Sequence, residues 1–213
     1  GIATFALINS REPTPGRRAT LAKHELSNLW SVDCGVSSGV SAAHRPVVSG
    51  NRLFAIESRS GGDRLMCIDA ATGTRMWTGS RACHGYLASH DGLVGALCPA
   101  TNGGESELVV FDAGSGRELW STAIDRTPGV ADFVKPSFNG DAVILVSGGA
   151  VSCFDAASGR SRWHRALSDR SGCTSPIVQG DTVYVGTTEA LYSLRADGGE
   201  LLASTPYPER MSS

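Results

Sequence analysis

The side chains most able to do chemistry in this sequence are its six cysteines, because thiols form disulfides and bind metals. An even number of cysteines in 213 residues is typical of an oxidising compartment. Cys83 and Cys98 lie symmetrically about a turn between His90 and Asp91, and opposed hairpin positions have the Cα separation that a bridge tolerates. The sequence therefore predicts a Cys83–Cys98 disulfide. A turn centred on Asp91-Gly92 instead would shift this register by one residue.

A metal site is the second chemistry that these residues suggest. Cys83, His84, His90 and Cys98 are possible ligands, but their spacing matches no zinc module, and we predict no metal. Three aspartates, Asp69, Asp112 and Asp155, recur at a regular interval and could be a ladder of acids. Each precedes a glycine-containing turn, where a carboxylate accepts hydrogen bonds from backbone N–H groups two or three residues later. We expect these aspartates to be structural.

Catalytic signatures are missing from the sequence. It contains no Gly-x-Ser-x-Gly, His-Glu-x-x-His or phosphate-binding loop. With 19 basic and 21 acidic residues and a net charge of −2, it has no electrostatic footprint for nucleic acid or an anionic membrane. A local basic cluster is interpreted as an edge strand that charge keeps from pairing: Arg160, Arg162, His164 and Arg165.

The elements that must position these residues are revealed by the tryptophans. Trp30, Trp77, Trp120 and Trp163 are the only tryptophans, and they stand 47, 43 and 43 residues apart. Three of them follow a motif of the form apolar-Asp-Ala-x-x-Gly-x-x-x-Trp, with glycines at Gly73, Gly116 and Gly159. A fourth copy has Arg195 in place of the aspartate and Ala203 in place of the tryptophan. A fixed interval of this length indicates a structural unit repeated along the chain.

Each unit contains short apolar runs separated by turn residues, with no helical period. In the first unit the runs 45–48, 53–56, 65–68 and 75–77 predict four strands joined by hairpin turns. One such sheet cannot bury both of its faces, so the units must stack, and four-stranded units stacked about an axis make a β-propeller. We predict an all-β fold with blades at about 43–79, 83–122, 131–166 and 173–205, within a repeat region 26–206.

This motif, together with Gly180 to Gly186 (Gly-Asp-Thr-Val-Tyr-Val-Gly), resembles the pyrroloquinoline-quinone-type repeat. That repeat builds quinoprotein alcohol dehydrogenases and non-enzymatic relatives, among them an outer-membrane assembly lipoprotein. The resemblance implies that the aspartate and glycine form the hairpin before the outermost strand and that the tryptophan packs between blades. Family domains mostly have seven or eight blades, whereas this chain has room for about four and a partial N-terminal one.

The resemblance also bears on catalysis. The quinoprotein enzymes use a quinone, a calcium ion, an aspartate base and usually a disulfide between adjacent cysteines, but this chain has no Cys-Cys dipeptide and too few blades. We therefore expect no catalytic, cofactor-binding or metal-binding residues and no cofactor. If four blades close into a ring, Cys34 and Cys173 would be neighbours and form a second candidate disulfide. Cys67 and Cys153, two residues before Asp69 and Asp155, are expected to be buried free thiols.

The sequence thus predicts an extracytoplasmic propeller that binds another protein, such as a member of a membrane-associated complex, without catalysis and without inserting into the membrane. Two alternatives stay open: a fragment of a quinone- or metal-dependent oxidoreductase, and the sensor ectodomain of a membrane-anchored protein. Residues 1–25 are an anchor tail, a linker or an extra strand, and the apolar run at 1–8 is too short to span a bilayer. Residues 207–213 are expected to be a C-terminal tail.

Overall fold

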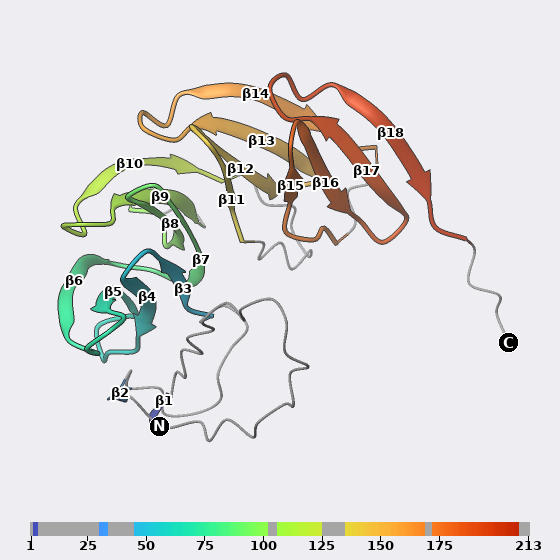
Figure 1. Ribbon diagram of the computed structural model, residues 1–213. Helices are drawn as coiled ribbons and strands as arrows, with labels where there is room; N and C mark the ends of the chain where they lie inside the picture. Colours follow the sequence, from blue (N-terminus) through green and yellow to red (C-terminus); the bar gives the residue numbers. More distant parts are fainter. Residues whose placement is uncertain are drawn as a thin grey trace, which may run out of the picture.

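The computed structural model describes residues 2–3, 30–33, 45–101, 106–124, 135–168 and 172–208. Every regular element in these ranges is a β-strand (Figure 1). Four antiparallel sheets of four strands each contain more than half of the described residues, and a short pair of strands precedes them. No membrane-spanning helix is found in these ranges.

The four large sheets are the blades of a β-propeller, and each is built from consecutive strands. The first consists of β3 (Val47–Ser49), β4 (Arg52–Glu57), β5 (Arg64–Asp69) and β6 (Arg75–Ala82). The second consists of β7 (Gly85–His90), β8 (Leu93–Cys98), β9 (Glu107–Asp112) and β10 (Glu118–Ala123). The third consists of β11 (Ser137–Asn139), β12 (Ala142–Ser147), β13 (Ala150–Asp155) and β14 (Ser161–Ala166). The fourth consists of β15 (Ile177–Gln179), β16 (Thr182–Gly186), β17 (Ala190–Arg195) and β18 (Leu201–Pro206).

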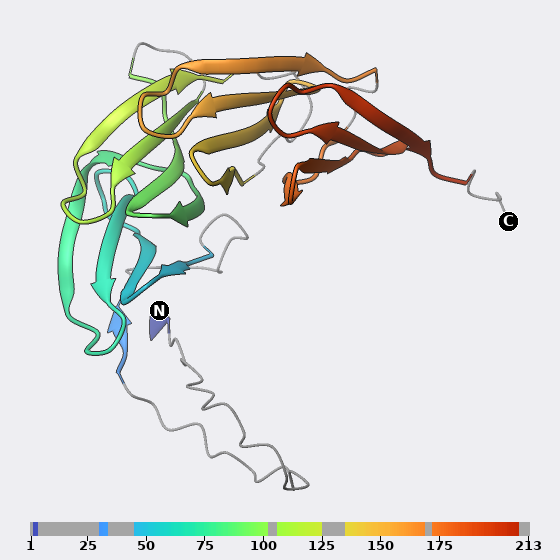
Figure 2. The same cartoon turned by 45° about the horizontal axis from the view of Figure 1, so that its top comes forward.

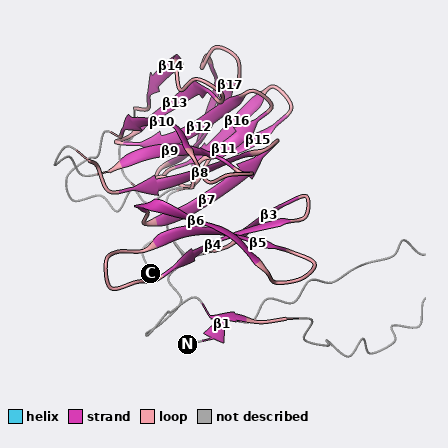
Figure 3. Cartoon of the chain, turned by 90° about the vertical axis from the view of Figure 1, so that its left-hand side faces the viewer, coloured by secondary structure: helices cyan, strands magenta, loops and turns pink. Residues whose placement is uncertain are grey.

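The blades follow one another along an open arc (Figures 1 and 2). The first strand of each blade lies on the concave side and the fourth on the convex side, so β3, β7 and β11 come next to one another near the axis. Viewed from the side, the sheets stack with their faces toward their neighbours (Figure 3). The fold class predicted from the repeat is therefore confirmed, with the arc open in this chain.

The middle strands of a blade are covered on both faces, which explains their continuous apolar sequences. β12 has the sequence Ala-Val-Ile-Leu-Val-Ser, and its first five residues are all buried. An alternating pattern would suffice for a sheet with one wet face, but an inner blade packs against a neighbour on each side. The unbroken apolar runs are thus a consequence of stacking.

The buried residues form three clusters along the arc rather than one central core. One cluster joins the second, third and fourth blades, another joins the first and second, and a small third one lies on the first blade beneath Trp30 and Val32. Val32 belongs to β2 (Val32–Asp33), which pairs with β1 (Ile2–Ala3). Residues 2–3 thus form a short strand, whereas the rest of the segment 1–25 lies outside the described residues and its role stays a prediction.

Candidate interaction surface

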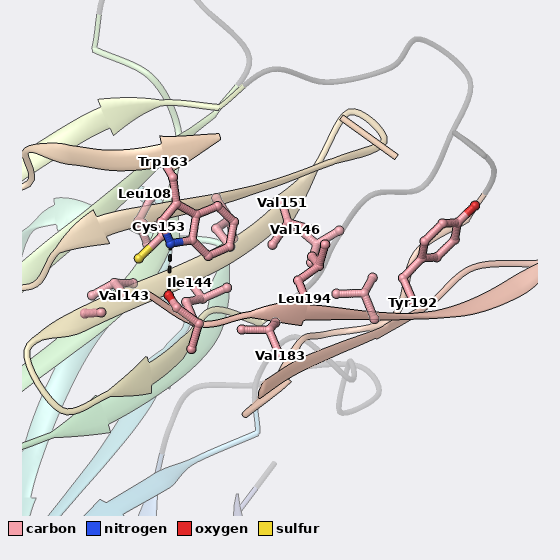
Figure 4. Packing of buried hydrophobic residues seen from close by; sticks show 14 of the residues in the cluster. Leu108, Val143, Ile144, Val146, Val151, Cys153, Trp163, Val183, Tyr192 and Leu194 are labelled. Carbon is pink, nitrogen blue, oxygen red and sulfur yellow. Dashed lines mark hydrogen bonds between the residues drawn. The ribbon is translucent and has the colours of Figure 1, made fainter. Parts of the chain in front are cut away.

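Neighbouring blades are held together by contacts that we call joints, and these joints fix how the surfaces of the arc are arranged. The tryptophans are central to the joints. Each indole N–H donates a hydrogen bond to an alanine carbonyl in the next blade. Trp77 reaches Ala113 at 3.1 Å and Trp120 reaches Ala156 at 2.8 Å. The other two bonds, Trp30 to Ala70 at 3.0 Å and Trp163 to Ala196 at 2.9 Å, repeat this contact. Figure 4 shows the indole of Trp163 directed into the fourth blade.

The glycine of each motif lies under the indole of the preceding blade. A Cβ atom built on Gly116 would stand 2.6 Å from the ring of Trp77, and one on Gly159 would stand 2.6 Å from that of Trp120. Gly116 has a φ of 72° and Gly159 one of 71°, where glycine is also favoured by the backbone. The glycine therefore serves the turn and the joint together. The sequence indicated the turn, but the alanine carbonyl that accepts the indole proton was missed.

The motif aspartates hold the turns in which these glycines lie. The Oδ1 atom of Asp112 accepts hydrogen bonds from the backbone N–H of Ser115 at 2.7 Å and from its hydroxyl at 2.6 Å. Asp69 and Asp155 make the corresponding bonds to Thr72 and Ser158. The hydroxyl of Ser115, followed by its backbone N–H, lowers the pKa of Asp112 below the ordinary value. The three carboxylates stabilise separate turns, and nothing brings them together as a group of acids.

One ion-pair network also crosses a joint. Arg81, on the outermost strand of the first blade, contacts the carboxylates of Glu107 and Glu118 on the second. Its guanidinium also donates to the carbonyl of Pro99 at 3.1 Å. The side chains of Arg81 and Glu107 are only 12% and 10% exposed, so the pair is largely shielded from solvent. Bonding to Arg81 lowers the pKa of Glu107 and keeps it charged.

The fourth blade receives a tryptophan from the third blade but has no tryptophan of its own. It receives Trp163 through Gly199, where a Cβ atom would lie 2.5 Å from the indole, and through the carbonyl of Ala196. Cross-strand pairing places Ala203 opposite Ser193, as Trp163 stands opposite Cys153 in the third blade. Because Ala203 stands where the other blades have tryptophan, the fourth blade has no indole that could pack against a further blade on its far face. Ile177, on the same row of that face, is 67% exposed.

The concave side of the arc contains a cavity. It has a volume of about 330 Å³ and is lined by the innermost strands of the first three blades. Polar groups come from Ser89, His90 and Lys135, whereas Val48 and Phe138 contribute apolar surface. The rings of His90 and Phe138 stack with centroids 6.3 Å apart. Mixed polar and apolar lining of this kind suits contact with a polypeptide.

Adjoining this cavity, the third and fourth blades are tied together near the axis. The Ser137 hydroxyl donates to the carbonyl of Pro176 at 2.6 Å, and the backbone N–H of Lys135 donates to the Ser175 hydroxyl at 2.9 Å. Sequence reasoning did not select these residues. A signal was present, however, because a proline precedes the innermost strand in three units, at Pro46, Pro136 and Pro176.

A smaller cavity of about 170 Å³ lies between the second and third blades. It contains Ser152 and His164, whose Oγ and Nδ1 atoms are 2.9 Å apart. The two residues are a cross-strand pair on β13 and β14. No aspartate or glutamate is among the residues that line this cavity. Within that lining, the pair therefore lacks the carboxylate that orients a catalytic histidine.

The structure contains Cys83 and Cys98 as free, buried thiols rather than as the predicted disulfide. The turn is centred on Asp91-Gly92, one residue later than the symmetry argument assumed, so strand partners near it are two residues further along. A bulge between Gly85 and Ala88, where Tyr86 has a φ of 55°, then shifts the pairing back toward the predicted one. Desolvation, followed by the neighbouring Cys83 thiol, raises the pKa of Cys98, and both side chains belong to the same buried cluster. The bridge stays a prediction for the oxidised protein.

The remaining cysteines differ in their outcomes. Cys67 and Cys153 are buried free thiols in the first and third blades, as expected, and desolvation raises the pKa of each to about 11. Cys173 is partly exposed, and Cys34 lies outside the described residues, so their pairing stays a prediction. Within the described ranges, no three histidine, cysteine, aspartate or glutamate side chains are grouped so that they could hold a metal.

Comparison with known proteins places this geometry in a family. A family model described as outer membrane protein assembly factor BamB matches residues 21–82 and 81–212. No curated protein matches the chain. Among solved structures, BamB from Moraxella catarrhalis is similar with a TM-score of 0.61 and 20% identity, over 85% of this chain and 56% of that one.

Other similar structures show how widely the fold is used. Quinohemoprotein alcohol dehydrogenase from Comamonas testosteroni has a TM-score of 0.60 and 19% identity, over 84% of this chain and 37% of that one. The computationally designed Ika4 protein has a TM-score of 0.56 and 16% identity, over 75% of this chain and 94% of that one. The chain thus spans about half the length of the BamB structure and less of the dehydrogenase. At these identities the likeness shows the fold alone.

Proposed function

Because the chain belongs to the outer membrane protein assembly factor BamB family, we propose that it is a protein-binding scaffold with no catalysis of its own. Its partner would be a protein of a membrane-associated assembly complex, and its location extracytoplasmic. The observation that carries this proposal is the family match, which extends over residues 21–82 and 81–212. The repeat residues support it, since the tryptophans, glycines and aspartates all serve joints and turns.

The surface best suited to the partner is the concave side at the first three blades. Its cavity combines the hydrogen-bonding groups of Ser89, His90 and Lys135 with apolar contacts from Val48, which is 49% exposed, and Phe138. These side chains lie on or just before β3, β7 and β11, which contact one another near the axis and belong to blades joined by Trp77 and Trp120. A rigid surface of mixed polarity can bind a protein with little loss of conformational entropy.

Site-specific photo-cross-linking tests this proposal. A benzophenone amino acid replaces Ser89 in the cavity or, as a matched control, the exposed Ser60 in a turn. Incubation with a solubilised bacterial envelope fraction should give a discrete cross-linked product at Ser89 that contains an outer-membrane assembly protein, and none at Ser60. Equal labelling at both positions, or products without such a protein, would contradict the proposal.

The oxidoreductase alternative rests on the shared fold with quinohemoprotein dehydrogenases. It predicts that the purified chain, mixed with pyrroloquinoline quinone and Ca²⁺, acquires the near-ultraviolet absorption of a bound quinone and reduces an artificial dye when given an alcohol. The scaffold proposal predicts neither change. The sensor alternative would instead require the same propeller surface to bind a small ligand rather than a protein.

A further inference from the structure

The outermost strands of the four blades differ in the charge that they carry. β6 carries Arg75 and Arg81, β10 begins with Glu118, and β14 carries Arg162, His164 and Arg165. β18 has the sequence Leu-Leu-Ala-Ser-Thr-Pro, without any charge, and all six residues are exposed. Charge is a common means of preventing an edge strand from pairing with another chain. In this respect β18 is the unprotected strand among the four outermost strands.

The hydrogen-bonding pattern identifies the free backbone groups on β18. Tyr207, just after the strand, donates its N–H inward to the carbonyl of Glu189 at 2.8 Å. Antiparallel pairs alternate between bonded and non-bonded positions, so Thr205 and Ala203 also bond inward to β17. Leu202 and Ser204 therefore direct their N–H and C=O groups outward. Pro206 has no N–H and ends the run of donors.

We propose that β18 is a self-association edge, at which a second copy of this chain pairs antiparallel about a two-fold axis. A two-fold pairing centred on Ala203 brings Leu202 opposite Ser204 of the second copy and Ser204 opposite its Leu202. This register uses both outward residues of each strand and forms four backbone hydrogen bonds. The two fourth blades then make one continuous sheet of eight strands.

The absence of charge on β18 favours a second copy of this chain as the binding partner. A charged edge would favour a partner of opposite charge, whereas an uncharged edge best fits another uncharged edge, which a second copy supplies. Apolar surface on the same blade supports the contact, since Leu201, Leu202 and Leu191 are 39%, 45% and 41% exposed. A single strand pair buries little surface, so the dimer is weak and depends on concentration.

Sedimentation equilibrium of the full chain over a concentration series tests the proposal. The wild type should show a monomer–dimer equilibrium. The Leu202→Arg/Ser204→Arg variant places like charges opposite each other and should raise the dimer dissociation constant about tenfold or more. The control, Ser161→Arg/Ala166→Arg, adds the same charge to exposed positions of β14 and should leave dimerisation unchanged. A wild type that stays monomeric up to about 1 mM, or equal effects of the two variants, would overturn the proposal.

Cross-linking tests the register independently of the strength of the dimer. Opposed non-bonded residues lie about 4.5 Å apart at Cα, so Ala203→Cys should form an interchain disulfide under mild oxidation. Thr205→Cys, which meets residue 201 of the second copy, should form far less, as should the wild type. Equal yields from the two variants would contradict the two-fold register. Because cross-linking at Ser89 does not involve β18, failure here would leave the proposed function standing, and the reverse also holds.

Discussion

Gly116 has a backbone role and a packing role, and comparison with a second glycine can separate them. It adopts a positive φ in its turn, and it leaves room for the indole of Trp77. Gly140 also has a positive φ, 55°, but a Cβ atom there would meet nothing within 4 Å. The two glycines therefore differ in the packing requirement while sharing the backbone one.

We expect Gly116→Ala to destabilise the fold by about 1–3 kcal/mol more than Gly140→Ala, because only the former forces an overpacked contact. Both variants have the cost of an alanine in the left-handed region, about 1–2 kcal/mol. Urea unfolding followed by tryptophan fluorescence measures the difference. Equal losses would mean that the indole can move aside and that the joint is looser than its geometry indicates.

The pKa of Asp112 gives stability a defined pH dependence. Since its folded-state pKa is lowered, its contribution is complete above the ordinary carboxyl value of about 3.9 and is lost as the pH falls through the lower folded value. Asp112→Asn removes this titration but keeps an acceptor. The Tm difference between wild type and variant should therefore be largest near neutral pH and shrink toward pH 2. A constant difference would show that the charge of Asp112 contributes nothing.

At the residue scale, sequence reasoning was most successful where a motif repeats. Regular spacing showed that the tryptophans and glycines belong to a repeated unit, and the resemblance to the pyrroloquinoline-quinone-type repeat implied their places between blades and in turns. Sequence reasoning did not give the register near Cys98, which depends on a bulge at Tyr86 outside the repeat motif, and the Cys83–Cys98 bridge stays a prediction. A bulged residue with positive φ depends on local packing, which a single chain does not display.

At the scale of elements, each tryptophan serves one joint, and the joints differ in what they connect. Trp120 fastens the second blade to the third, whereas Trp30 fastens only the short β1–β2 pair to the first. The ring of Trp120 also lies 6.2 Å from that of Phe154, at a tilt of 41°. Loss of an inner joint therefore separates two complete blades.

Trp120→Ala should cost about 3–5 kcal/mol, as truncation of a packed aromatic does, out of the ~5–15 kcal/mol typical of a domain. Trp30→Ala should cost less, because fewer packed residues lose their neighbour. Thermal unfolding by circular dichroism would show a larger fall in Tm for Trp120→Ala. If the order were reversed, the β1–β2 pair would contribute more to stability than an inner joint.

The strands themselves were largely predictable, whereas their contacts were not. The runs 53–56 and 65–68 lie within β4 and β5, because apolar runs between turn residues mark a buried strand. Contacts such as Arg81 with Glu107 join different blades, and nothing in the sequence indicates which charges meet. The candidate surface was missed for the same reason, since it is assembled from three blades.

At the scale of the whole molecule, the core is divided among joints, so stability should vary along the arc. The third blade has a complete blade on each side, whereas the fourth is open on its far face. Native-state hydrogen exchange in low urea should therefore protect amides of β12 and β13 more strongly than those of β16 and β17. Identical protection in both blades would instead indicate a single cooperative unit.

The replacement of tryptophan by Ala203 has a consequence for how such a chain can gain units by gene duplication. The fourth blade accepts the indole of Trp163 but has no tryptophan of its own. A unit appended after β18 would therefore receive no indole from the blade before it. A duplicated unit inserted between β10 and β11 would receive Trp120 from the blade before it and would meet Gly159 of the blade after it. We therefore expect this array to gain a blade more easily by insertion between two existing blades than by addition after the last one. The fourth blade would then remain the last blade.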